Sequence, residues 1–307
     1  MGSLTSDPAE ISCGVPQGSI LSPMLFSIYL LPVGDIARRF GLDFHCYADD
    51  VQLYLAFPAD NTGAVEVLEQ CLGEIRSWMS RNWLRLNQNK TEVLLIGRGL
   101  MCKNLRASFS PPVVDGEALR LVEVTKSLGV FLDSELSLER HISSMVSIGF
   151  FHLRNIRRLH PFLPHDSLAT LMHAFVSSRL DYCNALFAGL PLKLIHRLQL
   201  VQNAAAHVIK SVNRFDHITP VLRELHWLPI RWRITFKVLV LVFKALNGLG
   251  PEYLQNLLMP YAPAHPLRSL YRNLLTVPRM RSKVGERSFS FYAATSWNAL
   301  PIDIRSS

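Results

Sequence analysis

The distribution of apolar residues changes character near residue 134 of the 307-residue chain. Before that point, short strand-like apolar runs stand beside one long amphipathic pattern, which starts after N-cap candidates at 60–62 and reaches about residue 86. After it, apolar residues recur every three or four positions, as on the buried face of a helix. These helical stretches cover about 137–160, 165–188, 192–210 and 230–247. The pattern predicts an α+β fold, with a small sheet and helices first and an all-α part afterwards.

A glycine-rich segment opens the first expected helix. Residues 14–18 contain two glycines and a proline, which predict a loop whose backbone can approach a ligand closely. Ser22 and Pro23 then predict an N-cap and a first helical residue. The helix should reach about residue 40, with a kink or break near Pro32, because an interior proline costs about 3 kcal/mol.

Two adjacent aspartates, Asp49 and Asp50, interrupt an apolar run that predicts a hairpin over about 42–57. An unpaired charge is costly in a core, and Asp-Asp is not a favoured two-residue turn. One interpretation of the pair is a solvated hairpin tip. The other is a cation site, because Mg²⁺ binds one or two carboxylates together with substrate phosphates. With the glycine-rich loop upstream, the pattern favours metal binding.

The amino-acid sequences of these two segments resemble those of a known enzyme family. GVPQGSILSP at 14–23, followed by YADD at 47–50, resembles motifs B and C of the reverse transcriptase palm, and most of all the polymerase of non-LTR (LINE-type) retrotransposons. Three further segments resemble the same family. They are WLRLNQNKTE at 83–92 (motif D), SLGVFLD and HI within 127–142 (primer grip), and RSF and WNALP within 287–301 (tail). Group II intron maturases and telomerase belong to the same wider family but resemble the chain less.

This resemblance implies a partial polymerase palm, an antiparallel sheet with helices, at residues 1–134. It implies a helical thumb-like domain at 135–260 and a basic C-terminal tail at 261–307. The family's palm has a further aspartate on a strand before motif B, whereas the aspartate that precedes motif B here, Asp7, stands in a turn-like Ser-Asp-Pro context. We therefore expect a truncated polymerase domain that is inactive alone.

The resemblance also implies roles at a two-metal site. Asp49 and Asp50 would be catalytic and would hold Mg²⁺, with two ions in the family's intact site. Lys90 would protonate or neutralise the pyrophosphate leaving group, unless it is an ordinary surface lysine. Six further residues would contact an RNA template, a DNA primer and deoxynucleotides. The alternative interpretation is that they belong to an ordinary loop and a simple strand turn. They are Tyr47 beneath the primer–nucleotide junction, Gln17, Gly18 and Ser19 around the incoming nucleotide, and Leu128 and Gly129 along the primer.

Charge is unevenly divided along the chain. Residues 1–134 carry a net charge of −4 and residues 135–307 a net charge of +12. A basic part that meets phosphates would explain this asymmetry, as would an ordinary basic surface. Two groups of basic residues could bind nucleic acid. For each group there is a simpler interpretation: the arginine group could form a solvated helix face, and the tryptophans of the other group could lie in the core, which is the favoured interpretation for them. The two groups are Trp227, Arg231, Trp232 and Arg233, which could stack on bases, and Arg154, Arg157 and Arg158, which could track phosphates.

Five scattered cysteines, without a Cys-x-x-Cys pair, predict neither a disulfide framework nor a zinc site. They fit a reducing intracellular compartment, nuclear or cytoplasmic. The most apolar helix, about 234–246, carries two lysines and is too short to span a bilayer, which predicts a buried helix and no membrane partner. No protein partner is evident. The competing interpretations are a non-catalytic nucleic-acid-binding protein derived from a retroelement and a product without a role.

Overall fold

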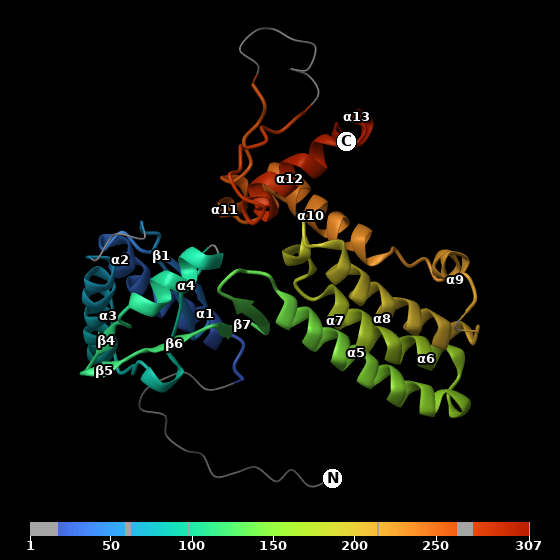
Figure 1. Cartoon of the computed structure of the whole chain (residues 1–307), viewed down its shortest axis with the longest axis horizontal. Coiled ribbons are helices and arrows are strands. Elements are labelled where there is room, and N and C mark those ends of the chain that lie inside the picture. Colours follow the sequence, from blue (N-terminus) through green and yellow to red (C-terminus); the bar gives the residue numbers. More distant parts are fainter. Residues whose placement is uncertain (1–17, 59–62, 98, 214, 263–272, 307) are drawn as a thin grey trace. The chain divides into compact units, whose positions relative to one another are not determined.

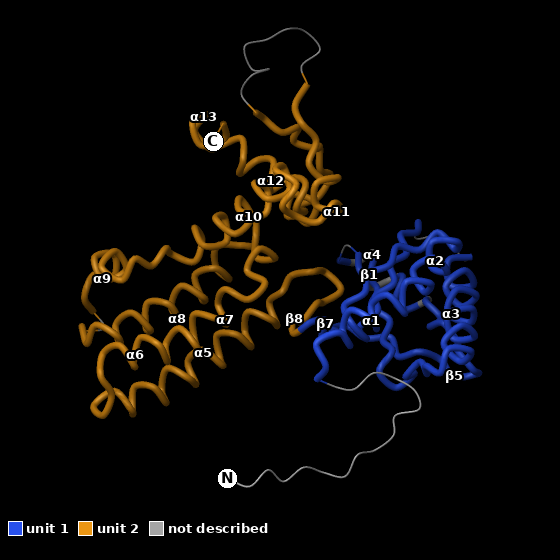
Figure 2. The backbone as a smooth tube through the Cα atoms, turned by 180° about the vertical axis from the view of Figure 1, so that it is seen from behind, with its two compact units in different colours: residues 1–128 blue, residues 129–307 orange. Residues whose placement is uncertain are grey.

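A computed structural model describes residues 18–58, 63–97, 99–213, 215–262 and 273–306. The chain divides into two compact units, residues 1–128 and residues 129–307 (Figures 1 and 2), here called unit 1 and unit 2. Unit 1 mixes helices with short two-stranded sheets, and unit 2 is built mainly from helices. The α+β class expected from the sequence is confirmed. Within the described ranges, no helix is long and apolar enough to cross a membrane.

Unit 1 begins with two short helices, α1 (Ser22–Tyr29) and α2 (Leu31–Arg39). The expected break is present, but it falls at Leu30 rather than at Pro32. The proline lies in the first turn of α2, where a missing N–H leaves no hydrogen bond unmade and the fixed φ suits a helix start. The break therefore places proline where a helix tolerates it.

A hairpin and a long helix complete the first part of unit 1. The hairpin consists of β1 (Asp43–Tyr47) and β2 (Asp50–Tyr54), and α3 (Gly63–Arg81) follows it. α3 ends at Arg81 rather than near residue 86, because the next turn places Trp83 at φ +58°. The inward faces of α2, α3 and the hairpin share one hydrophobic core. Its buried members include Val33, Ile36, Ala37, Cys71, Ile75 and Met79.

The sequence of residues 97–116, with Pro111 followed by Pro112, predicts a loop, but the segment contains regular structure instead. It holds α4 (Gly99–Ser108) and β4 (Val113–Val114), which forms a tight hairpin with β5 (Glu117–Ala118). The two turn residues, Asp115 and Gly116, have φ of +57° and +78°. A two-residue turn with positive φ at both positions favours Asp-Gly, so this sequence signal was present and the loop prediction was wrong.

Three further short strands end unit 1. β3 (Glu92–Leu94) pairs in parallel with β6 (Arg120–Val122), and β7 (Val124–Ser127) follows. The sequence predicts one short strand near residues 118–124, and the structure divides this segment among β5, β6 and the start of β7. Buried Leu72 of α3, Val114 of β4 and Leu119 form a second small core, against which Val93 of β3 packs.

The main helices of unit 2 lie within the predicted helical stretches. After β8 (Val130–Asp133), they are α5 (Glu139–Leu159), α6 (His165–Met172), α8 (Leu192–Lys210) and α10 (Ile230–Leu246). α5 and α8 lie against each other (Figure 1). They approach closely at Gly149, where an added Cβ would lie 2.7 Å from Val201 Cγ1. A side chain at this position would push the two helices apart.

The helix predicted over 165–188 is interrupted twice. α6 continues through a π-helical segment, His173–Ser177, into α7 (Ser178–Asp181). Cys183 then has φ +51° and starts the short 3₁₀ turn Asn184–Phe187. Phe187 is 1% exposed, so the second break directs a large side chain into the core of unit 2.

Shorter helices close unit 2. They are α9 (Ile218–Glu224), α11 (Glu252–Gln255), α12 (Phe289–Asn298) and α13 (Ile302–Arg305). α12 packs against α10, and its residues Ala293, Ala294 and Trp297 are buried in the same hydrophobic core as the long helices. Part of the segment 261–307 thus contributes to the core of unit 2.

Candidate functional site

The β1–β2 hairpin presents the two adjacent aspartates. Tyr47 pairs with Asp50, so the loop consists of Ala48 and Asp49, and Asp50 is already the first residue of β2. Ala48 has φ +54°, a conformation that costs a non-glycine residue about 1–2 kcal/mol. Asp49 and Asp50 are exposed. The sequence located the hairpin correctly but assigned both aspartates to its turn.

The two faces of this hairpin differ. Phe44, Cys46, Val51 and Leu53 pack onto the core of unit 1. The Cys46 thiol donates a hydrogen bond to the Ala48 carbonyl at 3.1 Å. Burial raises the pKa of this thiol, and the negative charges of Asp49 and Asp50 raise it further. The core-facing side therefore anchors the tip, while the carboxylates remain open to solvent.

The outward face carries alternate residues of both strands. Tyr47 is 68% exposed and stands opposite Asp50. Gln52 lies on the same face and donates a hydrogen bond from Nε2 to Oγ of Ser127, the last residue of β7. The Tyr54 hydroxyl donates to Gln52 Oε1. Sequence reasoning missed Gln52, although the period-two alternation places it on the face of Tyr47.

The loop before α1 is described only from Gly18 onward, and Gln17 lies outside the described residues. Gly18 has φ +91° and Ser19 is exposed. Ser22 is the first residue of α1 rather than its N-cap, and its N–H donates to Ser19 Oγ at 3.2 Å. Ser19 therefore satisfies one of the free N-terminal N–H groups of α1, that of its first residue.

Leu128 and Gly129 form the turn between β7 and β8, with φ of +44° and +83°. The hydrogen bond between Gln52 and Ser127 brings the start of this turn to the outward face of the hairpin. After β8, the Asp133 carboxylate accepts hydrogen bonds from the backbone N–H groups of residues 135, 137 and 138 and from the Ser137 hydroxyl. Asp133 thus organises the loop that leads into α5.

Lys90 is exposed at the end of a 3₁₀ turn, Gln88–Lys90, two residues before the start of β3. The neighbouring Glu92 has a structural role. Its carboxylate accepts a hydrogen bond from the Thr125 hydroxyl at 2.6 Å and pairs with Arg120. The Thr125 hydrogen bond lowers the pKa of Glu92, partial burial opposes it, and Arg120 adds to the lowering. Glu92 therefore ties together β3, β6 and β7.

Comparison with known proteins supports a polymerase relationship for this region. Residues 2–132 match the family described as reverse transcriptase (RNA-dependent DNA polymerase). The chain is 26% identical over 236 residues to the probable RNA-directed DNA polymerase from transposon BS of Drosophila melanogaster, covering 72% of this chain and 25% of that protein. It is 29% identical over 143 residues to the RNA-directed DNA polymerase from mobile element jockey of the same species, covering 44% and 14%.

A third relative is the probable RNA-directed DNA polymerase from transposon X-element of Drosophila melanogaster. It is 24% identical over 233 residues, which cover 73% of this chain and 24% of that protein. The chain therefore spans at most a quarter of the length of these curated relatives. No solved structure matches. The reverse transcriptase match includes the glycine-rich segment, the hairpin, Lys90 and the turn at 128–129.

The reverse transcriptase family implies divalent metal ions, and the hairpin tip is the place to test for them. Two neighbouring carboxylates supply the oxygen donors that Mg²⁺ prefers. Among the described residues, however, they do not belong to any group of three or more His, Cys, Asp or Glu side chains that could hold an ion. The two carboxylates are the right type of ligand for magnesium, but among the described residues they are too few to form a complete site.

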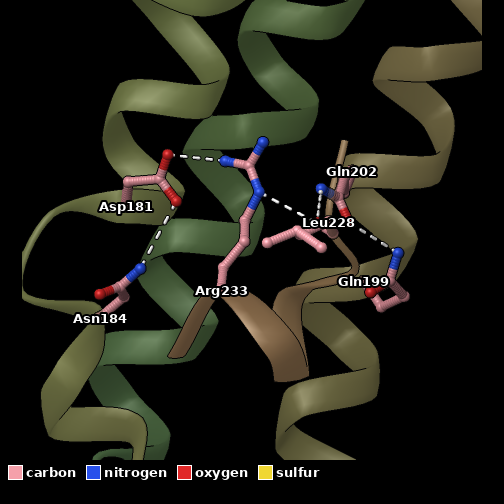
Figure 3. A network of polar contacts seen from close by, with 6 residues as sticks. All are labelled: Asp181, Asn184, Gln199, Gln202, Leu228 and Arg233. Carbon is pink, nitrogen blue, oxygen red and sulfur yellow. Dashed lines mark hydrogen bonds and ion pairs between the residues drawn. The ribbon is translucent and has the colours of Figure 1, made fainter. Parts of the chain in front are cut away.

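The basic–aromatic cluster at 227–233 is divided between core and surface. Trp227 is 8% exposed, which confirms the core interpretation for this residue. Arg233 donates from Nη1 to Asp181 at 2.6 Å and from Nε to the Leu228 carbonyl at 3.0 Å (Figure 3). Gln202 also donates to that carbonyl, at 2.9 Å. Arg233 therefore stabilises the turn before α10, whereas Trp232 is 54% exposed.

The basic residues of α5 lie at the surface. Arg154, Arg157 and Arg158 are all exposed. This is compatible both with phosphate contacts and with a solvated helix face.

The interactions of Glu92 predict an effect of pH on the stability of unit 1. Because its pKa is lower in the folded than in the unfolded state, ionised Glu92 stabilises the fold above the unfolded pKa of about 4.3. This contribution is lost as the pH falls through the folded pKa. Glu92→Gln should therefore destabilise unit 1 at pH 7 and do so much less at pH 3, as measured by urea unfolding. Exposed Glu117→Gln is the control, and an equal effect of Glu92→Gln at both pH values would contradict the prediction.

Proposed function

We propose that unit 1 is part of the palm of a LINE-type RNA-directed DNA polymerase and that unit 2 follows it as a thumb-like part with the tail. The main support is the hairpin tip, where Asp49 and Asp50 stand exposed beside Tyr47 in a segment that matches the reverse transcriptase family. The substrates would be an RNA template, a DNA primer and deoxynucleotides, with Mg²⁺ as cofactor.

The other residue roles belong to the same proposal. Tyr47 would lie beneath the junction of primer and nucleotide, and Lys90 would neutralise the leaving pyrophosphate. Leu128 would position the primer, supported by the hydrogen bond between neighbouring Ser127 and Gln52. The pocket for the incoming nucleotide would be lined by Gln17, Gly18 and Ser19, and the primer would also contact Gly129.

We further propose that the 307-residue polypeptide does not synthesise DNA by itself. The described residues offer two carboxylates at the hairpin tip without a further ligand, and two-metal catalysis needs a coordination shell around both ions. A primer-extension assay with Mg²⁺ or Mn²⁺ on an RNA template should give no incorporation above the blank. Incorporation that disappears in Asp49→Asn would contradict this prediction. Salt-dependent binding of an RNA–DNA duplex without synthesis would instead favour a purely binding function.

A graft tests the proposed role of the hairpin in a working enzyme. Residues 43–54 can replace the matching segment of the jockey polymerase, to which this chain is 29% identical. The graft should retain primer extension, and Asp49→Asn within it should lower the rate by about 10³-fold, since a catalytic metal contributes several kcal/mol. A folded graft that is equally active with and without Asp49 would contradict the polymerase assignment.

A further inference from the structure

The helix α10 is apolar on two opposite faces. At about 100° per residue, Ile230, Ile234, Val238, Val242 and Ala245 fall on one side, and all five are buried in the core of unit 2. Trp232, Phe236 and Phe243 fall within about 40° of one another on the other side. A helix that is apolar all round is normally buried all round. The prediction of a buried helix is therefore correct for one face of α10 and wrong for the other.

The second face, here called the outer aromatic face, consists of Trp232, Phe236 and Phe243. These side chains are 54%, 59% and 41% exposed. They project over about 16 Å of helix length, at 1.5 Å per residue. Three large rings gathered on one exposed helix face mark a binding surface more often than isolated surface residues do.

Three basic residues of α10 are neighbours in sequence of these aromatic residues. The Arg231 guanidinium lies over the Trp232 ring, 5.3 Å from its centroid. Lys237 and Lys244, which follow Phe236 and Phe243 in the sequence, are exposed. α10 contains no acidic residue. Across the described part of the chain, the ion pairs involve none of these three cations, in contrast to Arg233, which pairs with Asp181. Their charge is therefore available to an anionic partner.

We propose that the outer aromatic face of α10 binds single-stranded nucleic acid. Its rings would stack on bases while Arg231, Lys237 and Lys244 contact the phosphates. Aromatic side chains beside a basic track are the recurring means of binding single strands, because every base has a flat face for stacking. A duplex keeps its bases stacked internally and offers the rings no such faces. The site lies within unit 2 and uses no metal, so it stands independently of the proposed polymerase chemistry.

The test uses the full chain with EDTA and without nucleotides. The probes are fluorescein-labelled oligothymidine and oligouridine, followed by anisotropy over a salt series. Trp232→Leu keeps an apolar side chain but cannot stack, and it should weaken binding about 5- to 100-fold. Trp232→Phe retains a ring and should bind within about threefold of the wild type. Replacing both Lys237 and Lys244 with glutamine should reduce the slope of log K against log salt by about 1.4, at about 0.7 per phosphate contact.

Matched controls lie elsewhere in unit 2. Phe162 is 82% exposed, and Lys193 is an exposed lysine of α8. Phe162→Leu and Lys193→Gln should leave the affinity unchanged, and circular dichroism should show that all variants fold. Equal binding by the Trp232 leucine and phenylalanine variants would overturn the proposal. So would equally tight, Trp232-dependent binding of a blunt duplex. A loss of dimers in Trp232→Leu during sedimentation, with oligonucleotide affinity unchanged, would show instead that the face joins two copies of the chain.

Discussion

Replacing Trp297 with alanine is expected to lower the free energy of unfolding of unit 2 by about 3–5 kcal/mol. The side chain is 4% exposed, and its indole N–H donates to the Asn273 carbonyl at 2.8 Å. Alanine would leave a large cavity beside Ala293 and Ala294 and an acceptor without its donor. Because Trp297 lies in the last part of the chain, the variant also tests whether this part is integral to unit 2.

Urea unfolding read by hydrogen exchange in α8 and α10 measures this effect within unit 2 alone. Trp232→Ala is the matched control, because it removes the same side chain from a position that is 54% exposed. It should cost less than about 1 kcal/mol. If Trp297→Ala costs no more than the control, the packing of α12 described above is wrong.

The second large effect is expected at Asp133, where alanine should destabilise unit 2 by about 2–3 kcal/mol. The carboxylate accepts three backbone N–H groups, at 2.8 to 3.1 Å, and the Ser137 hydroxyl. Within this loop, Leu136 and Leu138 both have positive φ, a conformation that isolated leucine avoids. Without the carboxylate, the donors lose their partner and the loop loses what holds it in this conformation.

Thermal or urea unfolding of three variants separates the role of this carboxylate from that of general charge. Asp133→Asn keeps one acceptor oxygen and should lose less stability than Asp133→Ala. Glu135→Ala removes an exposed carboxylate from the same loop and should change the stability by less than about 0.5 kcal/mol. Similar losses in the Asp133 and Glu135 alanine variants would show that the loop does not depend on these hydrogen bonds.

The spacing of apolar residues along the sequence was sufficient to predict the helices and strands in which that spacing is regular. The helix predicted over 192–210 is α8 with the same bounds, and the hairpin predicted over about 42–57 is observed at 43–54. Each of these signals lies within one segment, where apolar spacing alone determines which face is buried. The hairpin also placed Asp49 and Asp50 together at the surface, as the sequence suggested.

Other features depend on information that periodicity does not carry. β3 and β6 are only three residues long and pair in parallel across 28 positions of sequence. The turn at Asp115 and Gly116 did carry a recognisable signal, but the adjacent prolines favoured a loop. α3 ends early because Trp83 adopts positive φ, which its residue type does not predict.

The candidate site also combines residues that the sequence predicted with contacts that only the fold reveals. Residue types and order suggested Tyr47, Asp49 and Asp50, whereas the link from Gln52 to Ser127 joins residues 75 positions apart and emerged only from the fold. Similarly, sequence could not distinguish Trp227 from Trp232. One lies in the core and the other at the surface, because the turn that Arg233 stabilises comes between them.

The hydrogen bond from Arg287 Nη1 to the Leu136 carbonyl, at 2.8 Å, joins residues 151 positions apart. During synthesis, the loop after β8 is made long before the residue that completes its contacts. Nascent α10 therefore lacks its packing against α12, and part of the core of unit 2 stays uncovered, until the final segment emerges from the ribosome. A ribosome that stalls within that segment would release a polypeptide with exposed apolar surface, a natural target for chaperones and proteases.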